Sequence, residues 1–338
     1  MIRLGEISFL NHFPISYGCS HTRLGEPVRM STYSPARLNL LLSLGQLEIS
    51  PISLLSYAEH YEDYWLLPDL SISAAYRVKS VALFSRFPID SLAGQSVALP
   101  DTSATSRALL RLLLEEYYGL PLVYSVCKPD LMSMLANHAA ALLIGDVGLQ
   151  AYYEHSRSSD LYVYDLVALW RSWTGLPVVF AVWAVRKDWA VKNKVETRGV
   201  ARWLQDGKAY SRRHRSEMLA AAVEYLPLPE DYIEEYLDDL SYDLGPEQQE
   251  GMDKFLQLLY EHKFVERPVT KEFFSEYEMM LAEIVAGRRM TTAEFLYLYN
   301  KADLLSLGQA ANQARDGKLP DKIVTFIIDR NINYTNAH

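Results

Sequence analysis

The stretch Val97–Leu114, V-A-L-P-D-T-S-A-T-S-R-A-L-L-R-L-L-L, contains a complete strand-to-helix transition. Val97–Leu99 is a short apolar strand, and Asp101–Ser106 is a run of small polar residues. After Arg107, apolar residues recur at helical spacing, at Leu109, Leu110, Leu113 and Leu114. A helix start has unpaired N–H groups and a partial positive charge, and with hydroxyls beside it can bind a carboxylate or phosphate. The same hydroxyls can equally serve as a helix cap, so both interpretations stay open at this point.

The residues before this stretch alternate between strand and helix patterns. The predicted strands are Ile2–Phe9, Val28–Tyr33, Leu47–Ile49 and Ile52–Tyr57. A helix is predicted over Ala36–Leu44, and Gly45 ends it. The repeated strand–helix–strand order predicts an α/β fold with parallel pairing. Asn11 follows the first strand, where such sheets present ligand-binding groups, although a turn or capping role explains this residue more simply.

Two later strands carry further polar candidates. Val78–Ser85 is apolar and β-branched, and it contains Ser80, whose hydroxyl needs a hydrogen-bond partner if it is buried. Ala139–Ile144 is strongly apolar and is followed by Gly145 and Asp146. A satisfied core serine accounts for Ser80 somewhat better than a ligand contact does. Capping of the next helix accounts for Asp146 at least as well as a catalytic role does.

The order of these elements predicts two α/β lobes and a C-terminal extension. Residues 1–86 and 182–268 form lobe 1, residues 87–181 form lobe 2, and residues 269–338 form a third segment. Ligands of such folds lie in the cleft between the lobes, which close over them. We therefore expect Asn11 and the helix start around Thr105 to face each other across the cleft. In the third segment, three helices are predicted before an apolar strand, Ile323–Ile328.

Composition restricts the class of ligand. The net charge is −9 and no basic run occurs, which argues against a nucleic-acid partner. Cys19 and Cys127 are the only cysteines, the histidines lack metal-binding spacing and no nucleotide-binding motif occurs, so neither a metal nor another cofactor is expected. The chain has no apolar run that could cross a bilayer and no secretion signal, so we expect a cytoplasmic protein without membrane contact.

Seven motifs resemble one known family, in order, over roughly residues 1–266. They are S-F-L-N-x-x-P-I, S-P-I-S-L-L-S-Y, L-P-D-L-S-I, V-x-S-V-A-L-F-S, T-S-A-T-S, A-A-L-L-I-G-D and W-T-G-L-P-x-V-F-A-V-W. The family is the chorismate dehydratases of the futalosine route to menaquinone. The resemblance implies an α/β fold like that of type II periplasmic binding proteins, here with a mostly helical C-terminal extension. It also implies conversion of chorismate to 3-[(1-carboxyvinyl)oxy]benzoate and water.

The resemblance also suggests site residues. The active-site asparagine and serine of the family match Asn11 and Ser80. The candidates for binding the dianionic substrate are Ser103, Thr105, Ser106, Gly145 and Asp146. Asparagine is a weak base, so we expect Asn11 to orient the leaving hydroxyl or the substrate, while a substrate carboxylate held near the ring hydrogen is a candidate base. The alternatives are a non-catalytic module that binds or senses a small chorismate-like anion, and an interaction scaffold.

The residues beyond Val265 resemble another family. A-D-L-L-x-L-G-x-A-A and V-T-F-I-I-D-R-N-I-N-Y-T-N are similar to the start of the radical S-adenosylmethionine cyclase of the same pathway. The C-x-x-x-C-x-x-C cluster of that family does not occur, so we expect a fusion protein cut short, without radical chemistry. A barrel strand without its barrel has open edges. We therefore expect Ile323–Ile328 to pair with a dehydratase lobe, to self-associate with another copy of the chain, or to be poorly ordered.

Overall fold

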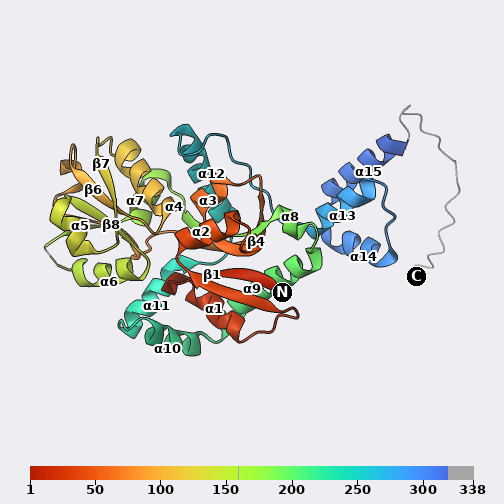
Figure 1. Cartoon of the computed structure of the whole chain (residues 1–338), viewed down its shortest axis with the longest axis horizontal. Helices are drawn as coiled ribbons and strands as arrows, with labels where there is room; N and C mark the ends of the chain where they lie inside the picture. The colour runs from red at the N-terminus through yellow and green to blue at the C-terminus, as the bar shows by residue number, and fades with distance from the viewer. Residues whose placement is uncertain (159, 319–338) are drawn as a thin grey trace, which may run out of the picture. The chain divides into compact units, whose positions relative to one another are not determined.

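Two β-sheets organise the described part of the chain, which is residues 1–158 and 160–318 of a computed structural model (Figure 1). The first sheet has the strand order β11-β4-β10-β3-β1-β2, and the second has the order β7-β6-β8-β5-β9. The strands of the first sheet are β1 (Ile2–Ile7), β2 (Val28–Tyr33), β3 (Ile49–Ser53), β4 (Tyr64–Ala74), β10 (Val178–Arg186) and β11 (Leu240–Ser241). Those of the second are β5 (Val81–Ser85), β6 (Ser96–Pro100), β7 (Val123–Cys127), β8 (Ala140–Ile144) and β9 (Tyr162–Asp165).

The two sheets correspond to the two predicted lobes, and each mixes parallel and antiparallel strands. β1 is parallel to β2 and β3, and β6 is parallel to β7 and β8, as the strand–helix–strand order predicts. β10 is antiparallel to β3 and β4, and β5 is antiparallel to β8 and β9. The chain crosses between the sheets at residues 75–80 and 175–177, which is earlier than the predicted lobe boundaries at 86 and 181. The reason is that β5 and β10 each pair along their whole length with the sheet that the chain is entering.

Helices cover both sheets, and local capping explains several of their boundaries. The helices in the first 274 residues are η1 (Leu10–His12), α1 (Phe13–Ser20), α2 (Pro35–Ser43), α3 (Leu54–Glu59), η2 (Ile89–Ser91), α4 (Ala104–Arg111), η3 (Leu112–Tyr117), α5 (Leu131–Asn137), α6 (Gly145–His155), α7 (Leu166–Thr174), α8 (Lys187–Ala190), α9 (Lys194–Arg213), α10 (Arg215–Tyr225), α11 (Glu230–Asp239) and α12 (Pro246–Glu261). The strand predicted over Ile52–Tyr57 ends at Ser53 instead, because the Ser53 hydroxyl accepts a hydrogen bond from the Ser56 N–H (3.3 Å) and caps α3. A short apolar run does not distinguish a strand from a buried helix, which explains the difference.

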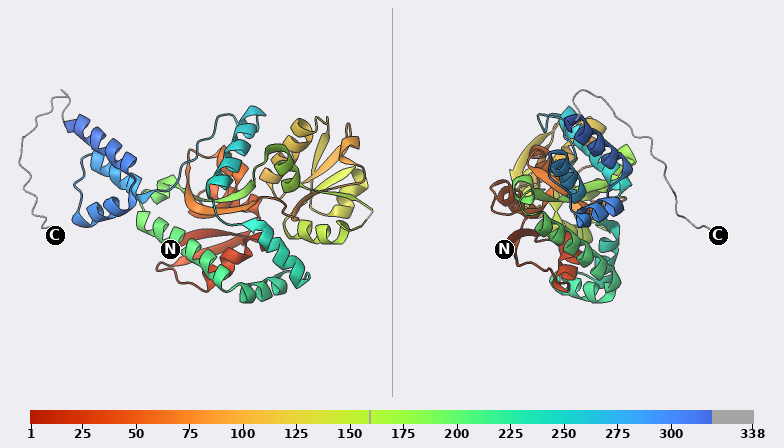
Figure 2. Two further views of the ribbon diagram at one scale, coloured as in Figure 1. Left: turned by 180° about the vertical axis from the view of Figure 1, so that it is seen from behind. Right: turned by 90° about the vertical axis from the view of Figure 1, so that its right-hand side faces the viewer.

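The return of the chain to the first sheet brings distant segments together. Helix α9 lies against α1, nearly two hundred residues earlier in the sequence, as Figure 2 shows. A Cβ atom on Gly18 would lie 1.8 Å from the carbonyl oxygen of Gly207, so the two helices approach as closely as glycine allows. This contact unites the first and last parts of lobe 1.

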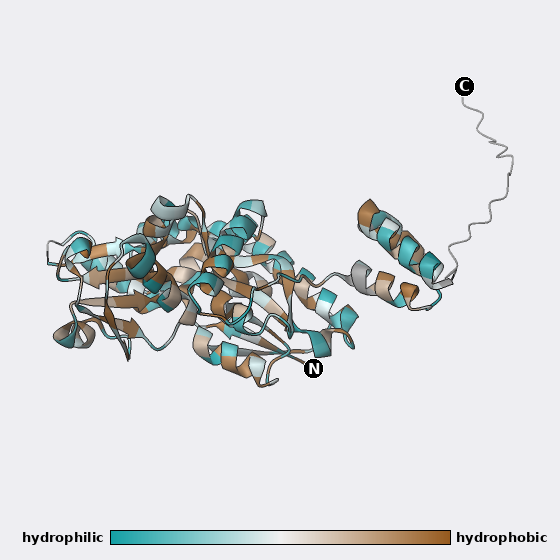
Figure 3. Ribbon diagram, turned by 90° about the horizontal axis from the view of Figure 1, so that it is seen from above, coloured by the Kyte–Doolittle hydropathy of each residue, from teal (hydrophilic) through white to brown (hydrophobic). Residues whose placement is uncertain are grey.

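The strands supply the apolar core. All five residues of β8 are buried, and the strands of the second sheet are drawn largely in the brown of hydrophobic residues in Figure 3. Phe84 of β5 packs there with Met134 and Leu135 of α5. Among the residues that the structure describes, no helix is both long and apolar enough to traverse a membrane.

Residues Ser275–His338 form a separate unit, described up to residue 318. Its helices are α13 (Glu276–Val285), α14 (Thr292–Lys301) and α15 (Leu304–Lys318), which confirms the three predicted helices. Thr291 and Glu294 form a reciprocal capping box at the start of α14. The unit begins after Phe274 rather than at residue 269, because Leu66 of β4 exchanges backbone hydrogen bonds with Glu272 and Phe274 (2.8 Å each). The predicted strand Ile323–Ile328 lies outside the described residues.

Candidate functional site

A small cavity between the two lobes collects most of the candidate residues. Its polar lining, for which we call it the serine cavity, consists of Asn11, Ser53, Ser80, Ser103 and Ser106. Gly145 also lines it, together with apolar residues that include Phe9, Ile144, Phe180 and Leu240. Its volume is about 40 Å³. The structure thus brings together five of the seven predicted site residues, while Thr105 and Asp146 lie beside the cavity rather than in its lining.

Asn11 supplies an unpaired hydrogen-bond acceptor. It lies in η1, the turn that follows β1, and its side-chain Oδ1 is buried without a hydrogen-bond partner among the described residues. A buried acceptor that is left unpaired costs about 1–3 kcal/mol, so its position is unfavourable unless a ligand or water binds it. Asn11 can therefore accept a hydrogen bond from a hydroxyl that enters the cavity.

Ser80 is presented by a tightly held segment between the two sheets. Lys79, which precedes it, has a φ of +54°, an uncommon conformation for a residue with a side chain. One oxygen of Asp165 accepts hydrogen bonds from the N–H groups of Val78 (2.8 Å) and Lys79 (2.6 Å), and this holds the segment in place. The Ser80 hydroxyl, which is buried, accepts a hydrogen bond from the hydroxyl of Tyr236 at 3.1 Å.

The start of α4 is capped by Ser103 and also lines the cavity. The Ser103 hydroxyl caps the helix by accepting from the Ser106 N–H (3.3 Å), and it also donates to the Ser106 hydroxyl (3.1 Å). Both serines nevertheless line the cavity. Because the Ser103–Ser106 hydrogen bond uses only one of the two hydroxyl protons, the pair keeps one proton that it can donate to a ligand at this helix start, alongside the helix dipole.

Thr105 and Asp146 connect the lobes. The Thr105 hydroxyl accepts the Leu55 N–H at 2.9 Å, which ties α4 to the first turn of α3. One Asp146 oxygen accepts the Leu10 N–H at 2.8 Å, which ties α6 to η1. Asp146 does not cap α6, because Ile144 occupies the N-cap position. Burial raises the pKa of Asp146 to about 6, although hydrogen bonds from Leu10 and Tyr225 oppose the shift.

Gly145 is required by the local backbone. Its φ is +64°, and a Cβ at this position would lie 2.9 Å from ring atoms of Phe9. Only glycine tolerates both the conformation and the contact. This close approach brings the start of α6 against η1 and closes one side of the cavity.

Two polar contributors to the site were not predicted. Ser53 lines the cavity and accepts a hydrogen bond from Asn39 Nδ2 at 3.0 Å. Like Ser103, it caps a helix directly after a buried strand, so the argument used for Ser103 could have found it. Tyr236 could not have been found, because nothing local in the sequence indicates that it contacts a serine 156 residues away.

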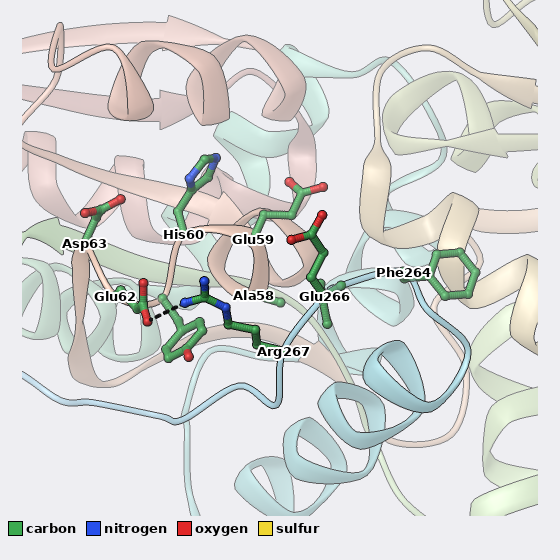
Figure 4. Close-up of a pocket in the computed structure, with 10 residues that line it drawn as sticks. Ala58, Glu59, His60, Glu62, Asp63, Phe264, Glu266 and Arg267 are labelled. Carbon is green, nitrogen blue, oxygen red and sulfur yellow. Dashed lines mark hydrogen bonds and ion pairs between the residues drawn. The ribbon is translucent and has the colours of Figure 1, made fainter.

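A second cavity, which we call the acidic cavity, has very different chemistry (Figure 4). Its volume is about 430 Å³, and its acidic, basic and histidine lining residues are Glu59, His60, Glu62, Asp63, Glu266 and Arg267. Arg267 forms an ion pair with Glu62 at 3.4 Å. The remaining carboxylates would repel a dianion, so the acidic cavity is a poor site for an anionic ligand despite its size. Within residues 1–158 and 160–318, no three His, Cys, Asp or Glu side chains gather as metal ligands would.

The two sheets with their covering helices form a fold like that of periplasmic binding proteins. The structure of the periplasmic aliphatic sulphonate binding protein of Escherichia coli superposes with a TM-score of 0.58 at 17% identity, over 79% of this chain and 94% of that one. This likeness confirms the predicted two-lobed α/β fold.

Sequence comparison identifies the family. The family described as menaquinone biosynthesis matches residues 2–261. The chorismate dehydratase of Thermus thermophilus is 31% identical over 269 residues, which is 76% of this chain and 93% of that protein. The chain therefore belongs to this menaquinone biosynthesis family, as the motifs predicted. A 65-residue segment, 19% of the chain, is 42% identical to the cyclic dehypoxanthine futalosine synthase of Streptomyces coelicolor, of which it covers 16%.

Proposed function

We propose that this chain is a chorismate dehydratase, a hydro-lyase that converts chorismate to 3-[(1-carboxyvinyl)oxy]benzoate and water. Its family membership and the 31% identity to the Thermus enzyme support this proposal. The observation that carries it at the site is the buried, unpaired Oδ1 of Asn11 in a cavity lined by serine hydroxyls. Such a lining suits a small oxygen-rich substrate.

The proposed reaction removes one ring hydrogen and the neighbouring hydroxyl, and the ring becomes aromatic. The C–H electrons form the new ring double bond, and the C–O bond breaks as hydroxide leaves and is protonated to water. Asn11 Oδ1 accepts a hydrogen bond from the hydroxyl and fixes its orientation. Ser106 and the start of α4 bind one carboxylate, and the other carboxylate of the substrate, held near the ring hydrogen, removes the proton.

Substrate entry requires the lobes to separate. Small-molecule sites usually have volumes of about 300–1,000 Å³, whereas the serine cavity has about 40 Å³. The ties that must loosen are Asp146 to Leu10 and Thr105 to Leu55. We therefore assign this arrangement to a closed state that forms around the substrate.

We also propose a cytoplasmic location and a place in the futalosine route. The relatives support the place in the route, since one is named as a chorismate dehydratase and the other as a cyclic dehypoxanthine futalosine synthase. Fractionation of cells that produce the full chain tests the location.

Incubation of the purified chain with chorismate tests the activity, with the product identified by liquid chromatography and mass spectrometry. We expect 3-[(1-carboxyvinyl)oxy]benzoate to accumulate in proportion to enzyme concentration. The likeness of the fold to solute-binding proteins favours one alternative, a module that binds chorismate without converting it. Saturable binding in calorimetry with no product would establish that alternative and overturn the proposed activity.

A further inference from the structure

Helix α11 packs against the segment that presents Ser80. Lys79 is almost fully buried, and its Nζ pairs with Glu235 (3.1 Å) and Asp239 (3.3 Å), both of α11. Tyr236 lies between these two acids in the sequence, is 1% exposed, and donates its hydroxyl proton to Ser80 Oγ at 3.1 Å. Helix α11 therefore contacts Lys79, the residue before Ser80, and also the Ser80 hydroxyl.

The direction of this hydrogen bond determines where the serine proton can point. A phenol and a serine hydroxyl each carry one proton. A phenol is the more acidic of the two hydroxyls and therefore the better donor, so Tyr236 donates, Ser80 Oγ accepts, and the serine proton is left for another partner. Within the described chain the Ser80 hydroxyl donates to no protein atom, and Ser80 lines the serine cavity. Its proton is therefore available to an oxygen atom that enters the cavity.

Tyr236 can keep the Ser80 hydroxyl in this orientation, but it cannot supply a proton to the reaction. Burial raises the pKa of Tyr236 well above its usual value, so the phenol stays protonated at any ordinary pH. A relay in which Tyr236 lost its proton would leave a buried phenolate. The group therefore remains a fixed donor to Ser80.

We propose that Tyr236 is a positioning residue that makes the Ser80 hydroxyl a donor to a substrate oxygen. Asn11 then supplies the acceptor and Ser80 the donor at the same small cavity, so that one substrate hydroxyl meets complementary partners. Without Tyr236 the serine proton is free to rotate, and part of the preorganisation of the site is lost. This inference rests on the proposed dehydratase function.

A double-mutant cycle tests the proposal. Tyr236→Phe should lower kcat/KM for chorismate by about tenfold, which is the loss expected for one ordinary hydrogen bond. Ser80→Ala should lower it at least as much. Tyr236→Phe in the Ser80→Ala background should have no further effect, because the tyrosine acts only through the serine. If the double variant loses the product of the two single-variant factors in kcat/KM, the proposal is overturned. Wild-type activity in Tyr236→Phe overturns it as well.

The control is Tyr242→Phe, which removes a buried hydroxyl that has no hydrogen-bond partner among the described residues. It should leave kcat/KM unchanged, and thermal unfolding of both variants verifies that they fold. If the wild-type chain binds chorismate without converting it, the proposed function fails, and the same cycle is measured on the dissociation constant. Non-additive losses there still support the positioning role, and additive or absent losses overturn it. Absence of both turnover and binding in the wild-type chain overturns both proposals.

Discussion

The acidic cavity has about ten times the volume of the serine cavity, yet the serine cavity is the more suitable site for a dianion. The acidic cavity is roomy, but its carboxylates either face solvent or, like Glu62, already pair with a neighbouring cation. The serine cavity is narrow, but it holds an unpaired acceptor, donor hydroxyls and a helix start. The difference teaches that unpaired, preorganised polar groups identify a site better than volume does.

Replacement of Asn11 should give the largest loss of activity, and it tests most directly whether the serine cavity is the reaction site. Asn11→Ala removes the unpaired acceptor, and we expect kcat for chorismate to fall by roughly 10²–10³-fold, the loss typical of a preorganised polar group at a reacting centre. Steady-state kinetics measures it. Asn137→Ala, at an exposed position at the end of α5, is the matched control and should behave as wild type. Near-normal turnover of Asn11→Ala would remove Asn11 from the mechanism.

Substitution of Gly145 tests whether the closed geometry of the serine cavity depends on glycine. Gly145→Ala introduces a strained positive φ and a collision with the Phe9 ring, and we expect the free energy of unfolding to fall by about 3 kcal/mol. Gly94→Ala separates these contributions, because Gly94 has a φ of +76° with open space around it. That control should lose only about 1 kcal/mol. Equal losses in urea unfolding would show that the Phe9 contact is unimportant.

The interlobe tie at Asp146 predicts a pH-dependent stability. In the folded chain burial raises the pKa of Asp146 from 3.8 to about 6, so between these values the folded state holds a proton that the unfolded state has released. This bound proton stabilises the folded chain at pH 4. As the pH rises through about 6 the free energy of unfolding falls, by roughly 3 kcal/mol at most.

Asp146→Asn retains an acceptor for the Leu10 N–H but cannot ionise, so its unfolding free energy should fall less between pH 4 and pH 6. Urea titrations across this range measure the two slopes. Asp130→Asn should leave the slope in place, because hydrogen bonds from Ser133 hold the pKa of Asp130 below its usual value. Identical slopes for wild type and Asp146→Asn would place the ionisation of Asp146 near that of an ordinary carboxyl.

Neutralising the acidic cavity should have the smallest effect on activity, and it tests whether this cavity takes any part in the reaction. Glu62→Gln with Glu266→Gln removes two carboxylates, and we expect kcat/KM for chorismate to stay within about twofold of wild type. Stability should change by less than about 1 kcal/mol, because the Glu62–Arg267 pair is exposed. A large change in kcat/KM would indicate that the acidic cavity takes part in the reaction and that the serine cavity alone does not explain the chemistry.

Local patterns in the sequence were sufficient for most of the secondary structure. The apolar run at Ala140–Ile144 forms a buried strand, and Ser103 caps α4, because both depend on residues within one turn or one strand. The run after Ile52 was misassigned, since strand and buried helix share the same short apolar pattern and only the Ser53 cap separates them. Local patterns do not specify the residues at which the chain crosses between the sheets, because these depend on strand-pairing partners that lie far away in the sequence.

The sequence by itself determined the family, the two-lobed class of fold and the set of polar residues from which a site could be built. Their local spacing and motif order contain that information. Only the tertiary structure decided how each group is used: Asn11 Oδ1 is left unpaired, whereas Thr105 and Asp146 are occupied by N–H groups of the opposite lobe. Tyr236 reaches Ser80 across 156 residues for the same reason. A hydrogen bond depends on positions and directions in space, and no local pattern specifies which distant partner a side chain will meet.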